Sequence, residues 1–233
     1  MATHDKASKR LFVLGATGGI GRAIVDQSIE RGHEVTAFVR SPEKLGAPRA
    51  GLTAVRGDPR SIDDLRAALP GHDAVLSSLG PPGPGPTTIN SDCARSTVAA
   101  MQATGVRRLL VVSVAVLFED QGFLFWLFRK TLLRNITKDS AEMERLVVAS
   151  RLDWTIVRPP TLTNGRLTGR YCIEDDRMPR GGIFVSRADV AEFLLDEIER
   201  GAHVRRTVGM ASAKSAAAAR PPGRVAMPNE TRA

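Results

Sequence analysis

The chain has few of the residues that build disulfide frameworks, metal clusters or membrane spans. Its 233 residues include two cysteines and one tyrosine, and aromatic residues make up 5% of the total. Because Cys93 and Cys172 lie far apart in the sequence, we expect two packed thiols and no metal site. There is no run of about 18 uncharged apolar residues, and the polar start MATHDKASKR lacks the apolar region of a signal peptide. We therefore expect a cytoplasmic protein without an integral membrane segment.

The formal net charge of +8 has no pattern that indicates nucleic-acid binding. Part of the excess lies in the C-terminal tail, where Glu230 is outnumbered by Lys214, Arg220, Arg224 and Arg232. This tail is rich in alanine and proline without periodicity, so we expect residues 211–233 to be disordered, and we expect the same of residues 1–8. The remaining basic residues form no helical stripe and are not interleaved with aromatic residues, so we expect no nucleic-acid partner.

The most informative stretch is residues 10–40, whose pattern is typical of a nucleotide-binding βαβ unit. An apolar run over residues 11–14 precedes a glycine-rich turn, after which apolar residues recur at near-helical spacing. Gly15 permits a tight bend, Gly18 lets the main chain approach a diphosphate, and Gly21 lets the helix pack closely on the sheet. Free amides and the helix dipole then favour the phosphates. The predicted cofactor contacts in this turn are Gly15, Thr17, Gly18, Gly19, Ile20 and Gly21.

Arg40, followed by Ser41, stands at the end of the second strand, where proteins of this kind select between NAD and NADP. A protein that binds the free 2′-hydroxyl of NAD usually has an Asp or Glu here, about 20 residues past the glycines. A guanidinium beside a hydroxyl suits the 2′-phosphate of NADP, because it supplies positive charge and several donors. The alternative is a solvated arginine at a strand end. The sequence favours NADP, with Arg40 and Ser41 as ligands.

The remaining elements alternate as a parallel sheet requires. Further strands are expected at residues 52–55, 74–79, 107–116, 154–157 and 204–208, and further helices at 61–69, 88–104, 140–150 and 187–199. The segment between residues 158 and 186 is expected to be irregular. This order predicts a single α/β domain over residues 9–210, with a doubly wound parallel sheet of the Rossmann type. Such sheets bind ligands at the carboxyl ends of their strands.

Several of these predicted strand ends carry residues that suit other parts of a dinucleotide. Asp58, after the third strand, is placed to accept from the adenine amino group. The residues after the fourth strand suit the ribose, and those after the fifth and sixth suit the nicotinamide. These predicted contacts are Ser78, Leu79, Gly80, Ser113, Pro159, Pro160 and Thr161. Each alone is also an ordinary loop residue, but their joint position at strand ends favours a cofactor site.

These motifs resemble the atypical short-chain dehydrogenase/reductases, in particular the NmrA-like, biliverdin reductase B (flavin reductase)-like branch. The similar segments are residues 15–18 with Gly21, 38–40, 57–58, 73–75, 152–160, 167–171 and 183–191. The resemblance covers residues 9 to 210 or so. It implies a Rossmann domain, NADPH as cofactor, and reduction of a flavin or tetrapyrrole-like acceptor.

The chain departs from the wider superfamily in the residues that protonate a carbonyl. Superfamily members pair a Tyr with a Lys four residues later, but Tyr171 is the single tyrosine and is followed by Asp175. Val114 stands where family members commonly have a Ser, and Ser113 is expected to point to the opposite side of the strand. Where biliverdin reductase B-like proteins have a His near the substrate, the aligned residue is Ser140.

Few side chains are left to donate a proton. The four histidines lie in the N-terminal tail, on a turn or ahead of strands, and we expect each to be a solvated surface group. The candidate catalytic residues are therefore Ser113, Lys138, Asp139 and Ser140. Hydride transfer to an unactivated ketone needs a protein group that donates a proton to the developing alkoxide. Flavins and quinones delocalise the incoming charge and can take the proton from water. We therefore favour an NADPH-dependent reductase of a flat conjugated small molecule: a flavin, a quinone or an aromatic polyketide-like acceptor.

Two other functions stay open. One is a tailoring enzyme that isomerises, dehydrates or reduces a specialised metabolite, with Lys138 and Asp139 in acid–base roles. The other is an NmrA-like regulator that binds NADP without chemistry. The aromatic-rich residues 118–133 are interpreted as a lid over a flat acceptor; core packing, a subunit contact and an interfacial helix are the alternatives. We expect a monomer or homodimer.

Overall fold

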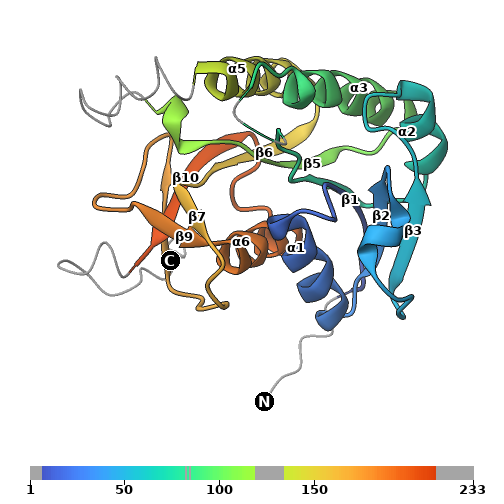
Figure 1. Ribbon diagram of the computed structural model, residues 1–233, viewed down its shortest axis with the longest axis horizontal. Helices are drawn as coiled ribbons and strands as arrows, with labels where there is room; N and C mark the ends of the chain where they lie inside the picture. The colour runs from blue at the N-terminus through green and yellow to red at the C-terminus, as the bar shows by residue number, and fades with distance from the viewer. Residues whose placement is uncertain (1–6, 82, 84, 119–133, 214–233) are drawn as a thin grey trace, which may run out of the picture.

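Eight strands form one mostly parallel sheet in the described part of the chain, residues 7–81, 83, 85–118 and 134–213 of a computed structural model (Figure 1). The strands are β1 (Arg10–Leu14), β2 (Glu34–Val39), β3 (Leu52–Arg56), β4 (Ala74–Ser77), β5 (Arg108–Val112), β6 (Asp153–Arg158), β8 (Tyr171–Asp175) and β10 (Arg206–Ser212). Their order is β3-β2-β1-β4-β5-β6-β10-β8, and β8 alone runs antiparallel to its neighbour in this sheet. The predicted single α/β domain with a doubly wound sheet is confirmed.

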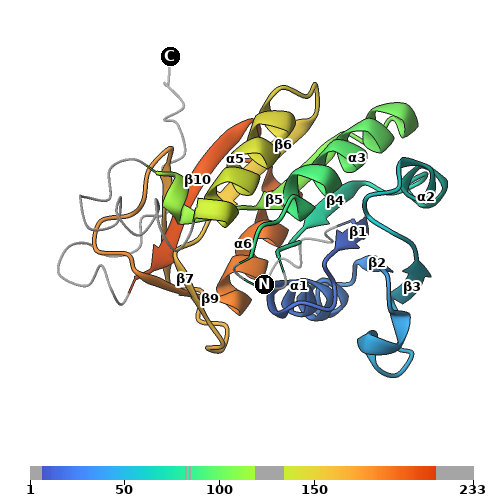
Figure 2. The same cartoon turned by 45° about the horizontal axis from the view of Figure 1, so that its top comes forward.

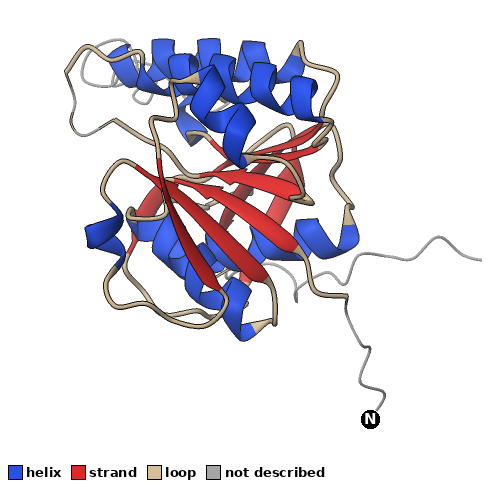
Figure 3. Cartoon of the chain, turned by 90° about the vertical axis from the view of Figure 1, so that its right-hand side faces the viewer, coloured by secondary structure: helices blue, strands red, loops and turns tan. Residues whose placement is uncertain are grey.

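Helices cover both faces of the sheet (Figures 2 and 3). One face carries α1 (Gly19–Glu30) and α6 (Arg187–Arg200), and the other carries α2 (Ile62–Ala68), α3 (Ile89–Thr104) and α5 (Arg134–Val148). Successive residues of β1 alternate between the two resulting cores. Leu11 and Val13 face α1 and α6, while Phe12 and Leu14 face the other layer. Burial on both faces explains why this strand reads as an unbroken apolar run.

Several elements depart from the sequence prediction, and β4 ends at Ser77, two residues before its expected end. β5 ends at Val112 and is followed by the short 3₁₀ helix η2 (Ala115–Leu117), so the strand expected to reach residue 116 is shorter. α5 already includes Arg134, six residues before its expected start. The segment expected to be irregular contains β8 and a second, two-stranded sheet of β7 (Thr161–Thr163) and β9 (Phe184–Ser186). Strands this short pair with partners distant in sequence, so local periodicity does not indicate them.

The two ends of the domain also differ in detail from the prediction. β10 runs from Arg206 to Ser212, whereas the strand was expected at residues 204–208, and it extends two residues beyond the expected domain boundary at residue 210. At the other end the Ser8 hydroxyl donates to the Gly32 carbonyl at 2.7 Å. Residues 1–6 and 214–233 lie outside the described residues, so the expected disorder of both tails stays a prediction.

The expectation that the histidines are solvated surface groups is wrong for the three that are described. His33 is 3% exposed, and its Nδ1 accepts from the Lys9 amide. His72 is held between the Thr36 hydroxyl and the Leu69 carbonyl. His203 bonds to Glu197, and this hydrogen bond raises the pKa of the imidazole. Each of the three imidazoles is held by a partner on a neighbouring element. The position of a histidine in a predicted turn does not indicate such a partner.

Both cysteines are free thiols, and burial raises the pKa of Cys93 to about 12. Among the described residues, none of the helices combines the length and apolar character needed to span a bilayer. Within the same residues, no three His, Cys, Asp or Glu side chains are grouped so as to hold a metal ion.

Candidate cofactor-binding site

A groove with a volume of about 170 Å³ lies at the carboxyl ends of β1, β2, β3 and β4. The chain order reverses between β1 and β4, and doubly wound sheets bind their ligands at such a switch point. The groove is lined by Gly15, Thr17, Gly18, Arg40, Asp58, Pro59, Arg60, Ser78, Leu79, Gly80, Ile89 and Cys93. The fold thus brings together residues that the sequence analysis singled out in four separate loops.

Two larger hollows lie elsewhere on the surface. One of about 260 Å³ lies beside α1 and the short 3₁₀ helix η1 (Pro42–Leu45), and one of about 270 Å³ is lined by Arg10 and His72, where the strands begin. Neither includes Gly15 or Gly18. The candidate site is therefore chosen by its position at the switch point and not by its size.

The glycine turn leaves the start of α1 open. The Gly18 amide donates to the Gly15 carbonyl at 2.9 Å, which closes the bend. A Cβ on Gly21 would overlap that carbonyl oxygen and lie 2.6 Å from Gly15 C, so glycine is required for the helix to approach the turn. Gly18 is the N-cap of α1, with no side-chain cap and no acidic residue in the first turn. An uncapped, positive helix end without a competing carboxylate fits a diphosphate group.

The opposite wall of the groove is attached directly to this turn. Both the amide and the hydroxyl of Ser78 donate to the Leu14 carbonyl, at 3.0 and 3.3 Å. This contact joins the end of β4 to the end of β1 and fixes where residues 78–80 begin. This hydrogen bond uses the Ser78 hydroxyl hydrogen, so the oxygen keeps its lone pairs as acceptors.

Arg40, Asp58 and Arg60 form the charged end of the groove. Arg40 is exposed, directly after β2. Asp58 accepts from Arg60 Nε at 3.1 Å and from Arg60 Nη2 at 2.8 Å. These bonds from Arg60 hold the pKa of the Asp58 carboxyl below its ordinary value. The sequence analysis missed Arg60, although an Asp-Pro-Arg turn after a predicted strand end indicates such a pair.

Residues predicted to border the nicotinamide lie at the ends of β5 and β6, outside the groove. The Ser113 amide donates to the Val157 carbonyl, and the Ala115 amide donates to the Pro159 carbonyl. These bonds set Ser113 beside the turn of Pro159, Pro160 and Thr161. The Ser113 side chain is 6% exposed, and within the described residues its hydroxyl has no hydrogen-bond partner.

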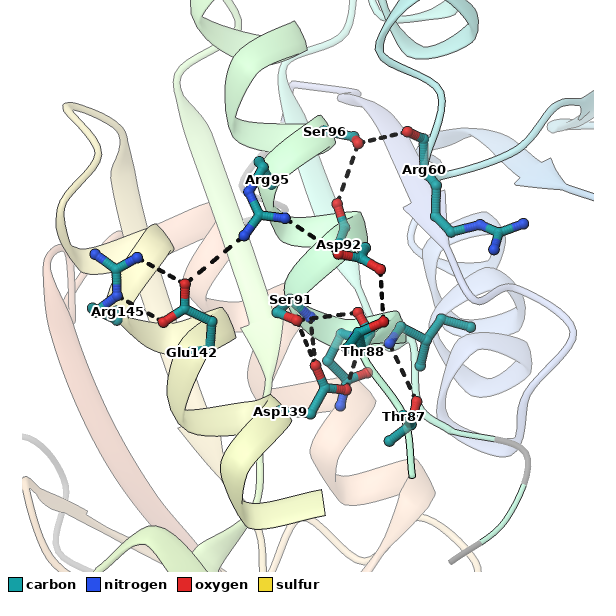
Figure 4. Close-up of polar contacts among 12 residues, drawn as sticks. Arg60, Thr87, Thr88, Ser91, Asp92, Arg95, Ser96, Asp139, Glu142 and Arg145 are labelled. Carbon is teal, nitrogen blue, oxygen red and sulfur yellow. Dashed lines mark hydrogen bonds and ion pairs between the residues drawn. The ribbon is translucent and has the colours of Figure 1, made fainter. Parts of the chain in front are cut away.

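The carboxylate of Asp139 caps helix α3 (Figure 4). One oxygen accepts from the Asn90 amide at 3.0 Å, and the other accepts from the amide and hydroxyl of Ser91 at 3.0 and 2.6 Å. The neighbouring Ser140 is 1% exposed and accepts from Asn90 Nδ2. Thr88, the N-cap residue, provides no side-chain cap of its own. Asp139 therefore satisfies helix amides from a second helix, which explains its burial without a role in proton transfer.

Replacing Asp139 by alanine is expected to lower the free energy of unfolding by ~2–4 kcal/mol, because buried amides and a hydroxyl lose their acceptor. Thermal or urea unfolding measures the loss. Glu142, a partly exposed residue of the same helix that pairs with Arg145, provides the matched control, and Glu142→Ala should change little. If Asp139 were a proton donor instead, Asp139→Asn would keep its melting temperature and lose turnover.

The other predicted residues do not line the groove. Gly19, Ile20 and Gly21 belong to α1, with Ile20 7% exposed in the core, and Ser41 is the residue before η1. Lys138 is exposed on α5 and does not line the groove. Tyr171 lies on edge strand β8, where burial raises the pKa of its phenol.

Arg187 is a second residue that the sequence analysis missed. Its side chain lies over the first residue of α1, since a Cβ on Gly19 would be 2.5 Å from Arg187 Cδ. Its Nη1 donates to Asn164 Oδ1 at 2.7 Å, which holds the guanidinium there. More than 160 residues separate Arg187 from Gly19, so no local pattern indicates the contact.

The predicted lid falls almost entirely on residues 119–133, which lie outside the described residues. Phe118, where the segment begins, is 5% exposed. The Arg158 guanidinium lies over its ring, with Arg158 Cζ 4.5 Å from the ring centre. Arg158 also forms an ion pair with Glu144 of α5. The start of the segment is thereby attached to β6 and α5, and its function as a lid stays a prediction.

This fold and groove define an NAD(P)-binding Rossmann domain. A family profile described as NAD(P)H-binding matches residues 15–200, and the chain belongs to that family.

Similar proteins span most of the chain. The chloroplastic protein At2g34460 of Arabidopsis thaliana is 31% identical over 215 residues, which cover 84% of this chain and 74% of that protein. YwnB of Bacillus subtilis is 27% identical over 205 residues, covering 83% of this chain and 94% of that protein. Among solved structures, a candidate NADH-flavin reductase of Streptococcus pneumoniae is 29% identical, with a TM-score of 0.71 and coverage of 88% of this chain and 100% of that one.

Proposed function

We propose that the protein is an NADPH-dependent reductase of a flat conjugated small molecule, with flavins, quinones and aromatic polyketide-like compounds as the acceptor class. The observation that carries the proposal is the groove at the switch point, in which an uncapped helix start and Arg40 lie together. Membership in the NAD(P)H-binding family supports a nicotinamide cofactor. The similarity to a candidate NADH-flavin reductase supports the acceptor class. The resemblance of the sequence motifs to the NmrA-like, biliverdin reductase B-like branch points to the same class.

In this proposal each part of the groove binds one part of the dinucleotide. Amides of the turn from Gly15 to Gly21 bind the diphosphate, helped by Arg187, whose guanidinium lies over Gly19. Arg40 and Ser41 bind the 2′-phosphate, and Asp58 accepts from the adenine amino group. Residues 78–80 contact the ribose.

In this proposal the acceptor lies near Ser113 and residues 159–161, and few of the candidate side chains can donate a proton to it. When bound, the cofactor supplies a hydride equivalent. Both oxygens of Asp139 are engaged by α3, and Ser140 is buried against Asn90. Of the candidate donors, Ser113 has a hydroxyl free of partners among the described residues, and Lys138 is exposed. We propose that Ser113, with residues 159–161, orients the acceptor and the nicotinamide, while the proton comes from water. A conjugated acceptor tolerates this because it delocalises the incoming charge.

Turnover with defined acceptors tests the proposal. We expect NADPH oxidation to accelerate with FMN or menadione and to stay at background with an unactivated ketone such as cyclohexanone. Ser113→Ala should reduce kcat by about tenfold or less, since an orienting hydroxyl contributes less than a general acid. Absence of turnover with every flavin and quinone would contradict the proposal.

A second candidate function is a nucleotide-binding regulator without catalysis. Two observations favour it. The Asp139 carboxylate caps α3, and Tyr171 lies on edge strand β8, far in the sheet from the strands whose ends form the groove. The same assay distinguishes the two functions, because a regulator binds NADPH with saturation and oxidises none of it with any acceptor.

A further inference from the structure

Arg60 is a charged residue of the groove to which the proposed function gives no role. Its Nε and Nη2 donate to the two oxygens of Asp58. Its backbone carbonyl accepts from Ser96 Oγ at 2.7 Å, and its guanidinium points away from that contact (Figure 4). The backbone is thus anchored to α3 and the side chain is anchored to Asp58. This double attachment gives the guanidinium a defined position at the charged end of the groove.

The charges at this end of the groove balance in a specific way. Its three ionised lining residues are Arg40, Asp58 and Arg60. Arg40 lies close enough to Asp58 to add to the effect of Arg60 on that carboxyl group. Without Arg60, the carboxylate would offset the charge of Arg40. With Arg60 present, the three groups together carry one positive charge.

This charge balance matters because NADPH differs from NADH only by the 2′-phosphate. A phosphate monoester carries a charge of about −1.5 to −2 at pH 7, so an uncompensated carboxylate beside it would be repulsive. The 2′-hydroxyl of NAD carries no charge and meets no such repulsion. An ionised Asp58 that no cation neutralises is therefore expected to weaken the binding of NADPH. The binding of NADH should stay nearly unchanged.

We propose that Arg60 determines cofactor specificity by neutralising Asp58, so that the groove favours the 2′-phosphate through Arg40. The inference rests on the proposed function, because it concerns the same dinucleotide site. Arg60 is a positioning residue in this account, since it acts through Asp58 and Arg40 binds the phosphate. Asp58 keeps acceptor capacity for the adenine amino group, because an ionised carboxylate has about four lone-pair sites.

The test compares dissociation constants of NADPH and NADH in four versions of the 233-residue chain: wild type, Arg60→Gln, the double variant Asp58→Asn with Arg60→Gln, and Arg56→Gln. Arg56 is the matched control, an exposed arginine at the end of β3 that pairs with Glu43 and does not line the groove. The readout is the ratio of the NADH constant to the NADPH constant. Any loss of an adenine contact affects both nucleotides and cancels in this ratio.

We expect Arg60→Gln to lower the ratio about tenfold by weakening NADPH alone, since a nearby like charge is then uncompensated. Removing the carboxylate in the double variant should restore the ratio to within about threefold of wild type, and Arg56→Gln should leave it unchanged. The Arg60 and Asp58 side chains are 55% and 38% exposed, so the variants are expected to fold, which their melting temperatures check.

An Arg60→Gln ratio equal to that of the wild type would overturn the inference. A ratio that stays low in the double variant would also overturn it, because Arg60 would then contact the phosphate directly. Both results leave the proposed function intact. A wild type that binds neither nucleotide would refute the proposed function itself.

Discussion

Replacement of Gly21 by alanine is expected to lower the free energy of unfolding by ~3 kcal/mol and to remove nucleotide binding. A Cβ at this position would overlap the Gly15 carbonyl oxygen and lie 2.8 Å from Ala16 Cα. Both neighbours are backbone atoms, which cannot move aside as a flexible side chain can. The helix α1 must therefore leave the turn, and the amides at its start move with it. Thermal unfolding and nucleotide titration measure the two effects.

Gly18 provides a comparison within the same turn. A Cβ there would be 3.3 Å from the Gly15 carbonyl oxygen, a close contact that a small shift relieves. Gly18→Ala should therefore stay near the wild-type melting temperature yet bind nucleotide poorly, because the methyl group occupies the approach of the diphosphate. Gly165, whose added Cβ would make ordinary contacts at 3.4 and 3.5 Å, is the control for both measurements. A stable, nucleotide-binding Gly21→Ala variant would contradict this account of the turn.

Replacement of Arg40 by aspartate is expected to weaken NADPH binding by about 100-fold or more, because a charge-assisted phosphate contact is replaced by repulsion. NADH should bind as well as in the wild type or better, since an acidic residue at the end of the second strand accepts from the free 2′-hydroxyl. Titration of both nucleotides measures the change in preference. The substitution lies on an exposed residue, so the melting temperature should change little.

Arg56→Gln again controls for the loss of a nearby positive charge. Its side chain is 71% exposed and pairs with Glu43. Parallel losses of both nucleotides in Arg40→Asp would show that Arg40 acts on a part of the cofactor that NADH and NADPH share. That result would contradict the assignment of Arg40 to the 2′-phosphate.

The first half of the fold could be predicted from local patterns alone. β1 is buried on both faces and reads as an apolar run, and α1 follows glycines whose spacing is set by the Gly15 bend. The helix start at Ser61 was also predicted, and the structure shows its hydroxyl accepting from the Asp64 amide. In each case the information lies within a few residues of the feature. Periodicity and capping rules read such features directly.

The second half depends on contacts between distant residues, and the prediction was poorer there. β7 and β9 are three residues each and pair across a separation of more than 20 residues. Asp139 follows no cap pattern of its own helix, because its acceptor role serves α3, almost 50 residues earlier. Arg187 reaches Gly19 from the start of α6. These contacts arise where the helix and sheet layers pack together, and residue spacing along the sequence does not indicate them.

Calorimetric titration of the full chain with NADPH, and in parallel with NADH, tests the central claim most directly. The account predicts saturable binding of one NADPH per chain, with an affinity at least about tenfold higher than that for NADH, since the extra phosphate meets a net positive end of the groove. Absence of saturable binding for both nucleotides would contradict it.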